Sequence, residues 1–268
     1  MHKTLLLLTL LLTAGLTAEP PAATTRIVTY DQVTAHRGSS AAAPENTLAS
    51  IRQAILDGSG YAEIDVQEAA DGVVMLMHDD SVLRTTGIDK PIWTLTSAEL
   101  KNASGGAWFH KRFASERVPT LDEALQAAKD RIRLNIELKN NGHGRRLAEE
   151  TVRLLQLHGA VRECTVTSFD KLLLAAVKRL DPQIKTGLIV GEKPASMESI
   201  LRDKSYDVVS IAYPLVEEPF VKEAAAYGKE VYVWTVNDPA QMKRMLKLGV
   251  ASIITNHPQE LVRLIRAR

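Results

Sequence analysis

The sequence of 268 residues has little cysteine, few aromatic residues and almost no net charge. The single cysteine, Cys164, excludes an internal disulfide framework and any cysteine-rich zinc site. Its 33 basic residues are matched by 32 acidic ones, which excludes the strong positive charge expected of a nucleic-acid-binding protein. Aromatic residues make up 5% of the chain, which counts against a large apolar rim facing lipid. The composition that remains, 45% hydrophobic and 24% charged, is that of an ordinary globular protein.

The first eighteen residues, MHKTLLLLTLLLTAGLTA, are typical of a secretory signal peptide. A lysine near the start precedes an apolar run over Leu5–Leu12, and small residues follow as far as Ala18. The run is too short to cross a bilayer comfortably, and no cysteine near the expected cleavage site offers a lipid anchor. A buried first helix is the alternative, but the extended pattern of Thr24–Thr29 disfavours it. We therefore expect a signal peptide at 1–18, a linker at 19–30, and a secreted or periplasmic protein without a stable membrane anchor.

The rest of the chain, residues 31–268, alternates between short β-rich runs and amphipathic helical stretches, with no flexible linker dividing it. Strands are predicted at Val33–His36, Ala62–Val66, Ile132–Leu138, Cys164–Ser168, Lys185–Val190, Val208–Ala212, Val231–Val236 and Ser252–Thr255. Helices are predicted at Asn46–Leu56, Leu121–Ala128, Leu147–Leu157, Lys171–Leu180, Met197–Leu201, Pro219–Ala226, Pro239–Leu248 and Gln259–Ile265. Eight β-then-α units favour a single (β/α)8 TIM barrel over a doubly wound sheet. Cys164 is then expected to be a small buried hydrophobic residue on a strand.

Val73–Met77 is also predicted to be a strand, but it does not belong to any of the eight β-then-α units. It follows the second strand too closely for a parallel crossover, so it must fold back as a hairpin through the turn at Asp71-Gly72. Pairing Glu68 with Val73 would place Glu63 opposite His78. Residues from about 80 to 118 then form a small insertion, in which Thr96-Ser-Ala-Glu99 is the capping box of one short helix. Before the hairpin, Pro44–Thr47 is typical of a helix start, with Asn46 as a plausible N-cap.

Polar residues gather where the predicted strands end, which is where a barrel of this kind has its active site. The strand-end motifs are His36-Arg37-Gly38, Glu63-Ile64-Asp65 and Glu137-Leu138-Lys139. Alternation along each strand turns the polar residues inward and the apolar ones out toward the helices. Three converging carboxylates repel one another unless a cation neutralises them. Because all the ligands are oxygens, we expect one divalent cation, Mg²⁺ or Ca²⁺ rather than Zn²⁺.

The residues beside this predicted metal site suit an anionic substrate. Arg37 and Lys139 can bind phosphate, for which a guanidinium fork is well shaped. His36 and His78 can divide the proton transfers between a base and an acid, because the pKa of histidine lies near neutrality. The combination is typical of metal-assisted cleavage of a phosphodiester.

These motifs, in this order, resemble the glycerophosphodiester phosphodiesterase family over essentially the whole predicted mature chain. The resemblance rests on His36-Arg37-Gly38, Pro44-Glu45-Asn46-Thr47, Glu63-Ile64-Asp65-Val66, Asp71-Gly72, His78-Asp79, Glu137-Leu138-Lys139 and Trp234-Thr235-Val236-Asn237. It implies a TIM barrel with a small insertion after the hairpin, a Ca²⁺ or Mg²⁺ ion, and hydrolysis of glycerophosphodiesters to an alcohol and glycerol 3-phosphate.

The resemblance also implies a role for each matching residue. The implied metal ligands are Glu63, Asp65 and Glu137, and the implied acid and base are His36 and His78. Arg37 and Lys139 would contact phosphate, Glu45 would lie close to the metal and substrate, and Trp234 would line the pocket. No role is implied for His257 in the eighth-strand motif.

Two other functions remain compatible with the sequence. One is a lysophospholipase D or sphingomyelinase D-like enzyme acting on long-chain lipids, for which Trp93, Trp108, Phe109 and Phe113 of the insertion would form an apolar rim. The other is a protein that binds glycerophosphodiesters without cleaving them, which the presence of all three carboxylates and both histidines disfavours. The sequence indicates a small-molecule substrate and no nucleic-acid partner. It leaves open the head group, the metal, the order in which the histidines act, a cyclic phosphate intermediate and the oligomeric state.

Overall fold

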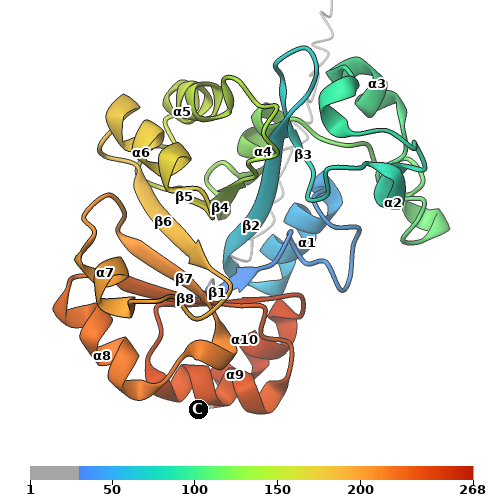
Figure 1. Ribbon diagram of the computed structural model, residues 1–268. Coiled ribbons are helices and arrows are strands. Elements are labelled where there is room, and N and C mark those ends of the chain that lie inside the picture. The colour runs from blue at the N-terminus through green and yellow to red at the C-terminus, as the bar shows by residue number, and fades with distance from the viewer. Residues whose placement is uncertain (1–29, 268) are drawn as a thin grey trace, which may run out of the picture.

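The computed structural model describes residues 30–267, in which eight parallel strands close into a barrel (Figure 1). The strands are β1 (Tyr30–Ala35), β2 (Ser59–Glu68), β4 (Arg133–Leu138), β5 (Thr165–Ser168), β6 (Lys185–Val190), β7 (Val208–Ala212), β8 (Glu230–Trp234) and β9 (Ser252–Thr255). Their order is β1-β9-β8-β7-β6-β5-β4-β2, and β2 pairs with β1 to close the ring. The predicted TIM barrel is therefore confirmed. The predicted signal peptide and residues 19–29 of the predicted linker lie outside the described residues.

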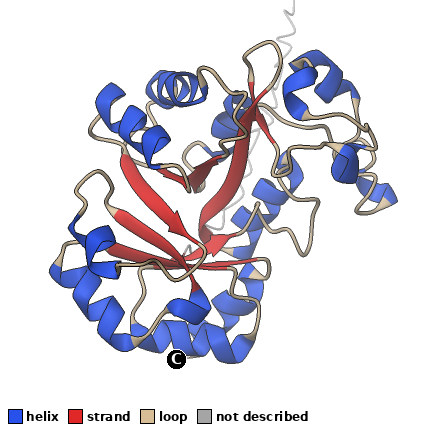
Figure 2. Cartoon of the chain, in the orientation of Figure 1, coloured by secondary structure: helices blue, strands red, loops and turns tan. Residues whose placement is uncertain are grey.

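Helices cover the outside of the ring (Figure 2). They are α1 (Leu48–Asp57), α4 (Leu121–Ala128), α5 (Leu147–Leu157), α6 (Lys171–Leu180), α7 (Met197–Arg202), α8 (Glu218–Ala226), α9 (Pro239–Leu248) and α10 (Pro258–Arg266), with a short 3-10 helix, η3 (Tyr213–Leu215). The outward-facing residues Ile64 and Ile136 are fully buried in one apolar core with residues of α1, α4 and α5. Period-two alternation therefore leaves Glu63, Asp65 and Glu137 to face the interior. Cys164, next to the start of β5, is buried in the same core, as expected.

The start of α1 differs from the prediction. Its N-cap is Thr47, whose hydroxyl accepts a hydrogen bond from the backbone N–H of Ser50 at 3.2 Å. Asn46, the expected cap, instead has a positive φ of 54°, a left-handed conformation that asparagine tolerates better than most residues. The polar side chain of Asn46 is thereby turned away from the helix end and toward the barrel interior, where it bonds Asp65.

The register of the hairpin also differs from the prediction by one residue. The returning strand β3 (Val74–Leu76) is antiparallel to β2, and Glu68 pairs with Val74 rather than Val73. The loop therefore holds five residues, 69–73, with Gly72 at a φ of 82°. The backbone carbonyl of Asp65 accepts a hydrogen bond from the backbone N–H of Met77, so Asp65 lies opposite Met77. The predicted pairing of Glu63 with His78 is therefore wrong. His78 nevertheless enters the site, because it follows directly after this strand.

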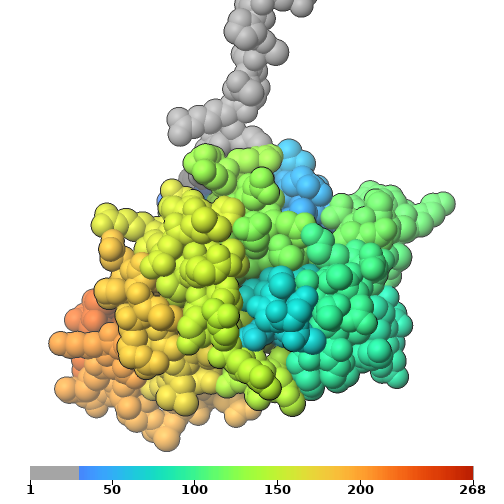
Figure 3. Space-filling model, turned by 90° about the horizontal axis from the view of Figure 1, so that it is seen from above, coloured from blue at the N-terminus to red at the C-terminus, as the bar shows by residue number. Residues whose placement is uncertain are grey.

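The segment after β3 forms the insertion, which lies beside the mouth of the barrel (Figure 1). It contains α2 (Leu83–Thr86), η1 (Ile92–Thr94), α3 (Ser97–Asn102) and η2 (Lys111–Phe113). The capping box predicted for Thr96 and Glu99 starts α3, as expected. Met75 and Met77 of the hairpin pack with Val82, Ile92 and Leu100 in a small separate core. In Figure 3 the hairpin, in cyan, lies between the insertion, in green, and the α5 region, in yellow-green. Within residues 30–267, no helix has the length and apolar character needed to cross a bilayer.

Candidate active site

A cavity opens at the carboxyl ends of the barrel strands. It is lined by His36, Arg37, Glu63, Asp65, His78, Asn135, Glu137, Lys139, Thr167, Phe169, Ile189, Ser210, Trp234, Thr235 and Ile254. Eight of the nine site residues expected from the sequence are among them, although they come from widely separated parts of the chain. Glu45 does not line this cavity.

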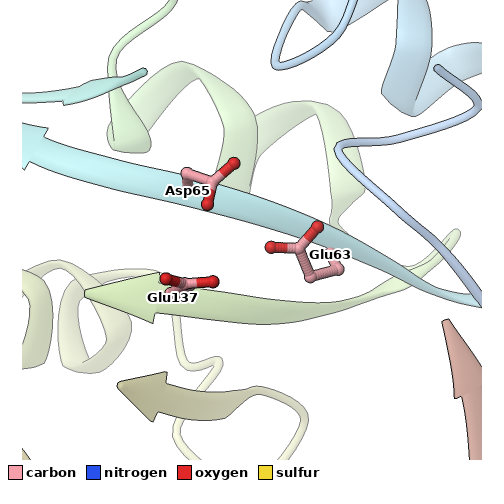
Figure 4. A group of neighbouring side chains, drawn as sticks. All are labelled: Glu63, Asp65 and Glu137. Carbon is pink, nitrogen blue, oxygen red and sulfur yellow. The ribbon is translucent and has the colours of Figure 1, made fainter. Parts of the chain in front are cut away.

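Three neighbouring carboxylates line one side of the cavity. Glu63 and Asp65 project from β2 and Glu137 from the neighbouring β4, and the three point toward one another (Figure 4). One oxygen of each lies within 4.8 Å of the others. Burial, followed by the charges of Asp65 and Glu137, raises the pKa of Glu63 well above its ordinary value. Burial and then the charge of Asp65 raise the pKa of Glu137 to about 7. Negative charge is therefore costly here, and an all-oxygen set of this kind fits a hard divalent cation.

Two cationic side chains flank the carboxylates. Nζ of Lys139 donates to Oε1 of Glu137 at 2.8 Å and lies 3.7 Å from Asp65. Arg37 has a φ of 55°, and its backbone N–H donates to Oε2 of Glu63 at 2.7 Å. Nε of Arg37 lies 3.5 Å from Asp65 but makes no hydrogen bond within the described chain. The two cationic side chains carry less charge than the three carboxylates. A bound divalent ion would make the total charge of the site positive, which suits an anionic substrate.

The two histidines have different partners. Nδ1 of His36 lies 2.6 Å from Oδ1 of Asn256. Because an amide oxygen only accepts, the neutral ring carries its proton on Nδ1 and leaves Nε2 as an acceptor. Burial, followed by the charge of Arg37, lowers the pKa of His36 to about 4. Nδ1 of His78 instead lies 2.7 Å from Oδ1 of Asp79, and because a carboxylate oxygen accepts, Nδ1 is the donor.

A model of the glycerophosphoryl diester phosphodiesterase family matches residues 36–260. The chain belongs to this family. The glycerophosphodiester phosphodiesterase of Caldanaerobacter subterraneus subsp. tengcongensis is 32% identical over 243 residues, which cover 87% of this chain and 97% of that protein. Family membership makes the chain an enzyme, a phosphoric diester hydrolase, in a family whose members are metal-dependent.

Solved structures show the same relationship. A phosphodiesterase from Oleispira antarctica, in complex with the product sn-glycerol-3-phosphate, aligns with a TM-score of 0.83 at 32% identity, covering 88% of this chain and 96% of that one. A glycerophosphodiester phosphodiesterase from Thermotoga maritima aligns with a TM-score of 0.71 at 27% identity, covering 88% and 98%. This phosphodiesterase therefore shares its fold with solved phosphodiesterases.

Glu45 lies behind Arg37 rather than at the cavity surface of this phosphodiesterase. Its Oε1 accepts from Arg37 at 2.8 Å, and both of its oxygens accept from Arg84 of the insertion, also at 2.8 Å. Arg84 also donates to Oδ2 of Asp79 at 2.6 Å. Burial raises the pKa of Asp79, but hydrogen bonds from Arg84 and His78 outweigh it and lower that pKa to about 2. Arg84 was not singled out by the sequence, because its partner Glu45 is 39 residues away.

Asn46 is a second residue that sequence reasoning misplaced. Its side-chain amide donates to Oδ2 of Asp65 at 2.9 Å, and its Oδ1 accepts from the backbone N–H of Asp65 at 3.1 Å. Both contacts fix the orientation of one predicted metal ligand. The motif Glu45-Asn46-Thr47 was the signal for this residue, but the pattern is equally typical of a helix start.

The wall opposite the carboxylates is apolar. Phe169 and Trp234 meet edge to face, with ring centroids 6.0 Å apart, beside Ile189 and Ile254. Nε1 of Trp234 is buried and makes no hydrogen bond to any residue from 30 to 267, so it is a donor available to a ligand. The cavity thus has a charged side suited to a phosphodiester and an apolar side suited to an organic group.

The aromatic residues of the insertion lie outside this cavity. The ring of Trp93 stacks on His143 with centroids 4.1 Å apart. Phe109 packs edge to face against both Trp108 and Phe113. These rings therefore contact one another or His143 rather than the cavity, and 41% of Trp108 remains exposed.

Proposed function

We propose that this phosphodiesterase hydrolyses glycerophosphodiesters to an alcohol and sn-glycerol 3-phosphate with one divalent cation and a pair of histidines. The observation that carries the proposal is the convergence of three carboxylates, two cations and two histidines on one cavity. The product bound to the Oleispira antarctica relative supports the same substrate class.

Glu63, Asp65 and Glu137 would hold the cation, Ca²⁺ or Mg²⁺. When bound, such an ion neutralises negative charge on the phosphodiester and favours attack at phosphorus. Arg37 and Lys139 bind the non-bridging phosphate oxygens, and they stabilise the charge that grows on those oxygens in the transition state. Lys139 also keeps Glu137 in place through its ion pair at 2.8 Å.

The partners of the histidines suggest how the proton transfers are divided. His36, neutral and with a free Nε2 acceptor, removes a proton from the nucleophile, which is either water or the glycerol hydroxyl next to the ester. His78, which Asp79 holds through Nδ1, gives a proton to the departing alkoxide as its bond to phosphorus breaks. If the glycerol hydroxyl attacks, a cyclic phosphate forms first and water opens it in a second step. Capture of a cyclic phosphate in single-turnover reactions would distinguish the two routes.

The apolar wall of Phe169 and Trp234 would face the alcohol or the glycerol carbon chain. A lipid-active enzyme, the second candidate, would need to admit a long acyl chain past this wall. Trp108 is the one insertion aromatic that is largely exposed among those expected at the rim, so the insertion offers little apolar surface for that purpose.

The experiment that tests this function follows glycerol 3-phosphate release from a panel of glycerophosphodiesters, and choline release from lysophosphatidylcholine. The protein is first treated with a chelator, and Ca²⁺ or Mg²⁺ is then added back separately. We expect turnover of the water-soluble diesters only with a divalent ion, and none by Glu63→Gln under the same conditions. Faster turnover of lysophosphatidylcholine would favour the lipid-active alternative, and binding without any product would favour a non-catalytic protein.

We also propose, from the sequence alone, that residues 1–18 direct export to the periplasm or the medium. Amino-terminal sequencing of the protein recovered after expression of the full chain should begin at Glu19. Recovery of the protein with Met1 in place would overturn this proposal.

A further inference from the structure

Arg84, on α2 of the insertion, connects two residues that stand directly behind the reactive groups. Its Nε donates to Asp79 at 2.6 Å, and its two terminal nitrogens donate to the two oxygens of Glu45 at 2.8 Å each. One planar guanidinium therefore makes three hydrogen bonds to two carboxylates in a fixed geometry, and a lysine ammonium has no such rigid fork.

Each of these carboxylates also accepts a hydrogen bond from a residue that lines the cavity. Asp79 accepts from Nδ1 of His78 at 2.7 Å through the oxygen that Arg84 leaves free. Glu45 accepts from the guanidinium of Arg37 at 2.8 Å. A continuous chain of ion pairs thus runs from the proposed acid to the proposed phosphate ligand, with Arg84 at its centre.

Stability alone does not account for this arrangement. The side chain of Arg84 is 42% exposed, where single ion pairs contribute little to folding, although a bidentate pair within a network contributes more. The insertion is held to the hairpin by its own apolar core, in which Val82, Ile92 and Leu100 are fully buried. What Arg84 does supply is a fixed direction for Asp79 and Glu45, and through them for His78 and Arg37.

We propose that Arg84 is a positioning residue for catalysis, through which the insertion orients both His78 and Arg37. The inference rests on the proposed function, since it assigns those two residues to proton transfer and phosphate binding. The insertion would then contribute to catalysis by orienting two residues of the active site.

Arg84→Met tests the proposal, with Arg52→Met as a matched control. Arg52 is likewise half-exposed and joins the barrel to the insertion, through Glu116 at 3.3 Å, but it touches no residue of the cavity. We expect Arg84→Met to lower kcat by about 10–100-fold through misplaced His78, and to raise KM through misplaced Arg37. Arg52→Met should leave both constants unchanged. Arg84→Lys should recover only part of the loss, because an ammonium lacks the planar fork that bonds both oxygens of Glu45 and one of Asp79 together. Unchanged kcat and KM in Arg84→Met, or full recovery in Arg84→Lys, would overturn the proposal.

A readout that needs no turnover separates this proposal from the proposed function. In protein labelled with ¹⁵N-histidine, the ring signals of His78 are assigned by their loss in His78→Gln. We expect these signals to shift or broaden in Arg84→Met and to stay in place in Arg52→Met, while thermal unfolding shows both variants folded. Unmoved His78 signals in Arg84→Met would refute positioning even if the wild type is an active phosphodiesterase. Moved signals in a protein without phosphodiesterase activity would support positioning and reject the function.

Discussion

His36 and His78 illustrate how individual side chains in this cavity acquire separate tasks. A neutral amide, Asn256, bonds Nδ1 of His36, whereas a carboxylate, Asp79, bonds Nδ1 of His78. Burial, followed by the charge of Arg37, lowers the pKa of His36 to about 4, although the hydrogen bond to Asn256 acts in the opposite direction. In the proposed mechanism, these different surroundings let two residues of the same type serve as base and acid.

Replacing either histidine should abolish most activity and leave the fold intact. His36→Ala and His78→Ala are each expected to lower kcat by roughly 10²–10⁴-fold, because each removes one proton transfer. The measurement is steady-state kinetics on glycerophosphocholine with saturating divalent ion. His158→Ala is the matched control, since His158 pairs with Asp122 on the surface at the end of α5. Near-normal turnover in either cavity variant would contradict the assignment.

Sequence and structure agree best on residues whose direction follows from strand alternation. Glu63 and Asp65 lie within β2 and Glu137 near the end of β4, so their shared face was fixed once the strands were located. The direction of Arg84 depends instead on the path of the whole insertion, and that of Asn46 on a single left-handed backbone conformation. No local pattern marks Arg84, and the pattern around Asn46 is equally typical of a helix start. The supporting roles of these two residues were therefore missed, although the residues that line the site were found.

Element boundaries were predictable where a cap or a clear periodicity marked them. Helices α4, α5, α6 and α9 have the predicted bounds, and α4 opens with the predicted capping box of Thr120 and Glu123. The hairpin register was off by one residue because Asp71-Gly72 marks a turn without specifying how many residues the loop contains. The error changed the predicted partner of His78 without removing it from the cavity.

The capping box of α4 allows a test of stability that is separate from catalysis. Thr120→Ala should lower the free energy of unfolding by about 1 kcal/mol, because the backbone N–H of Glu123 loses its acceptor. Urea denaturation measures this change, and kcat should stay the same because α4 lies on the outside of the barrel. Thr120→Ser retains the hydroxyl and should be close to wild type. An equal loss in the serine variant would show that the methyl group, rather than the cap, is responsible.

At the scale of the whole molecule, eight βα units were enough to predict closure of the barrel, because each unit brings one strand and one covering helix. The net charge of the chain, by contrast, did not indicate where charged residues gather. The chain is almost neutral, yet its barrel mouth gathers three carboxylates in one cavity. Arg37 and Lys139 offset only part of the electrostatic cost of that cluster, because the pKa of Glu137 is still raised. The stability of the fold should therefore depend on pH and on a bound cation.

The sign of that dependence follows from Glu137, whose pKa is raised to about 7 in the folded protein. Between about pH 4.5 and pH 7 the folded state then holds a proton that the unfolded state has lost. This contribution to stability is complete at low pH and is lost as the pH rises through that window. The lowered pKa of His36 acts in the opposite direction, so the melting temperature of the wild type alone does not isolate the effect. A comparison with Glu137→Gln does, because the variant retains His36 and the Lys139 contact but cannot ionise at position 137.

In chelated protein, Glu137→Gln should therefore gain thermal stability relative to the wild type as the pH is raised from 5 to 8. Added Ca²⁺ or Mg²⁺ should reverse the order, because only the wild type has all three ligands. At a concentration of 100 times the dissociation constant, binding stabilises the folded state by about 2.7 kcal/mol. For a domain of this size that amounts to roughly 5–10 °C in melting temperature. A difference between the two proteins that stays constant with pH and with added ion would show that the carboxylates are structural charges and do not form a cation site.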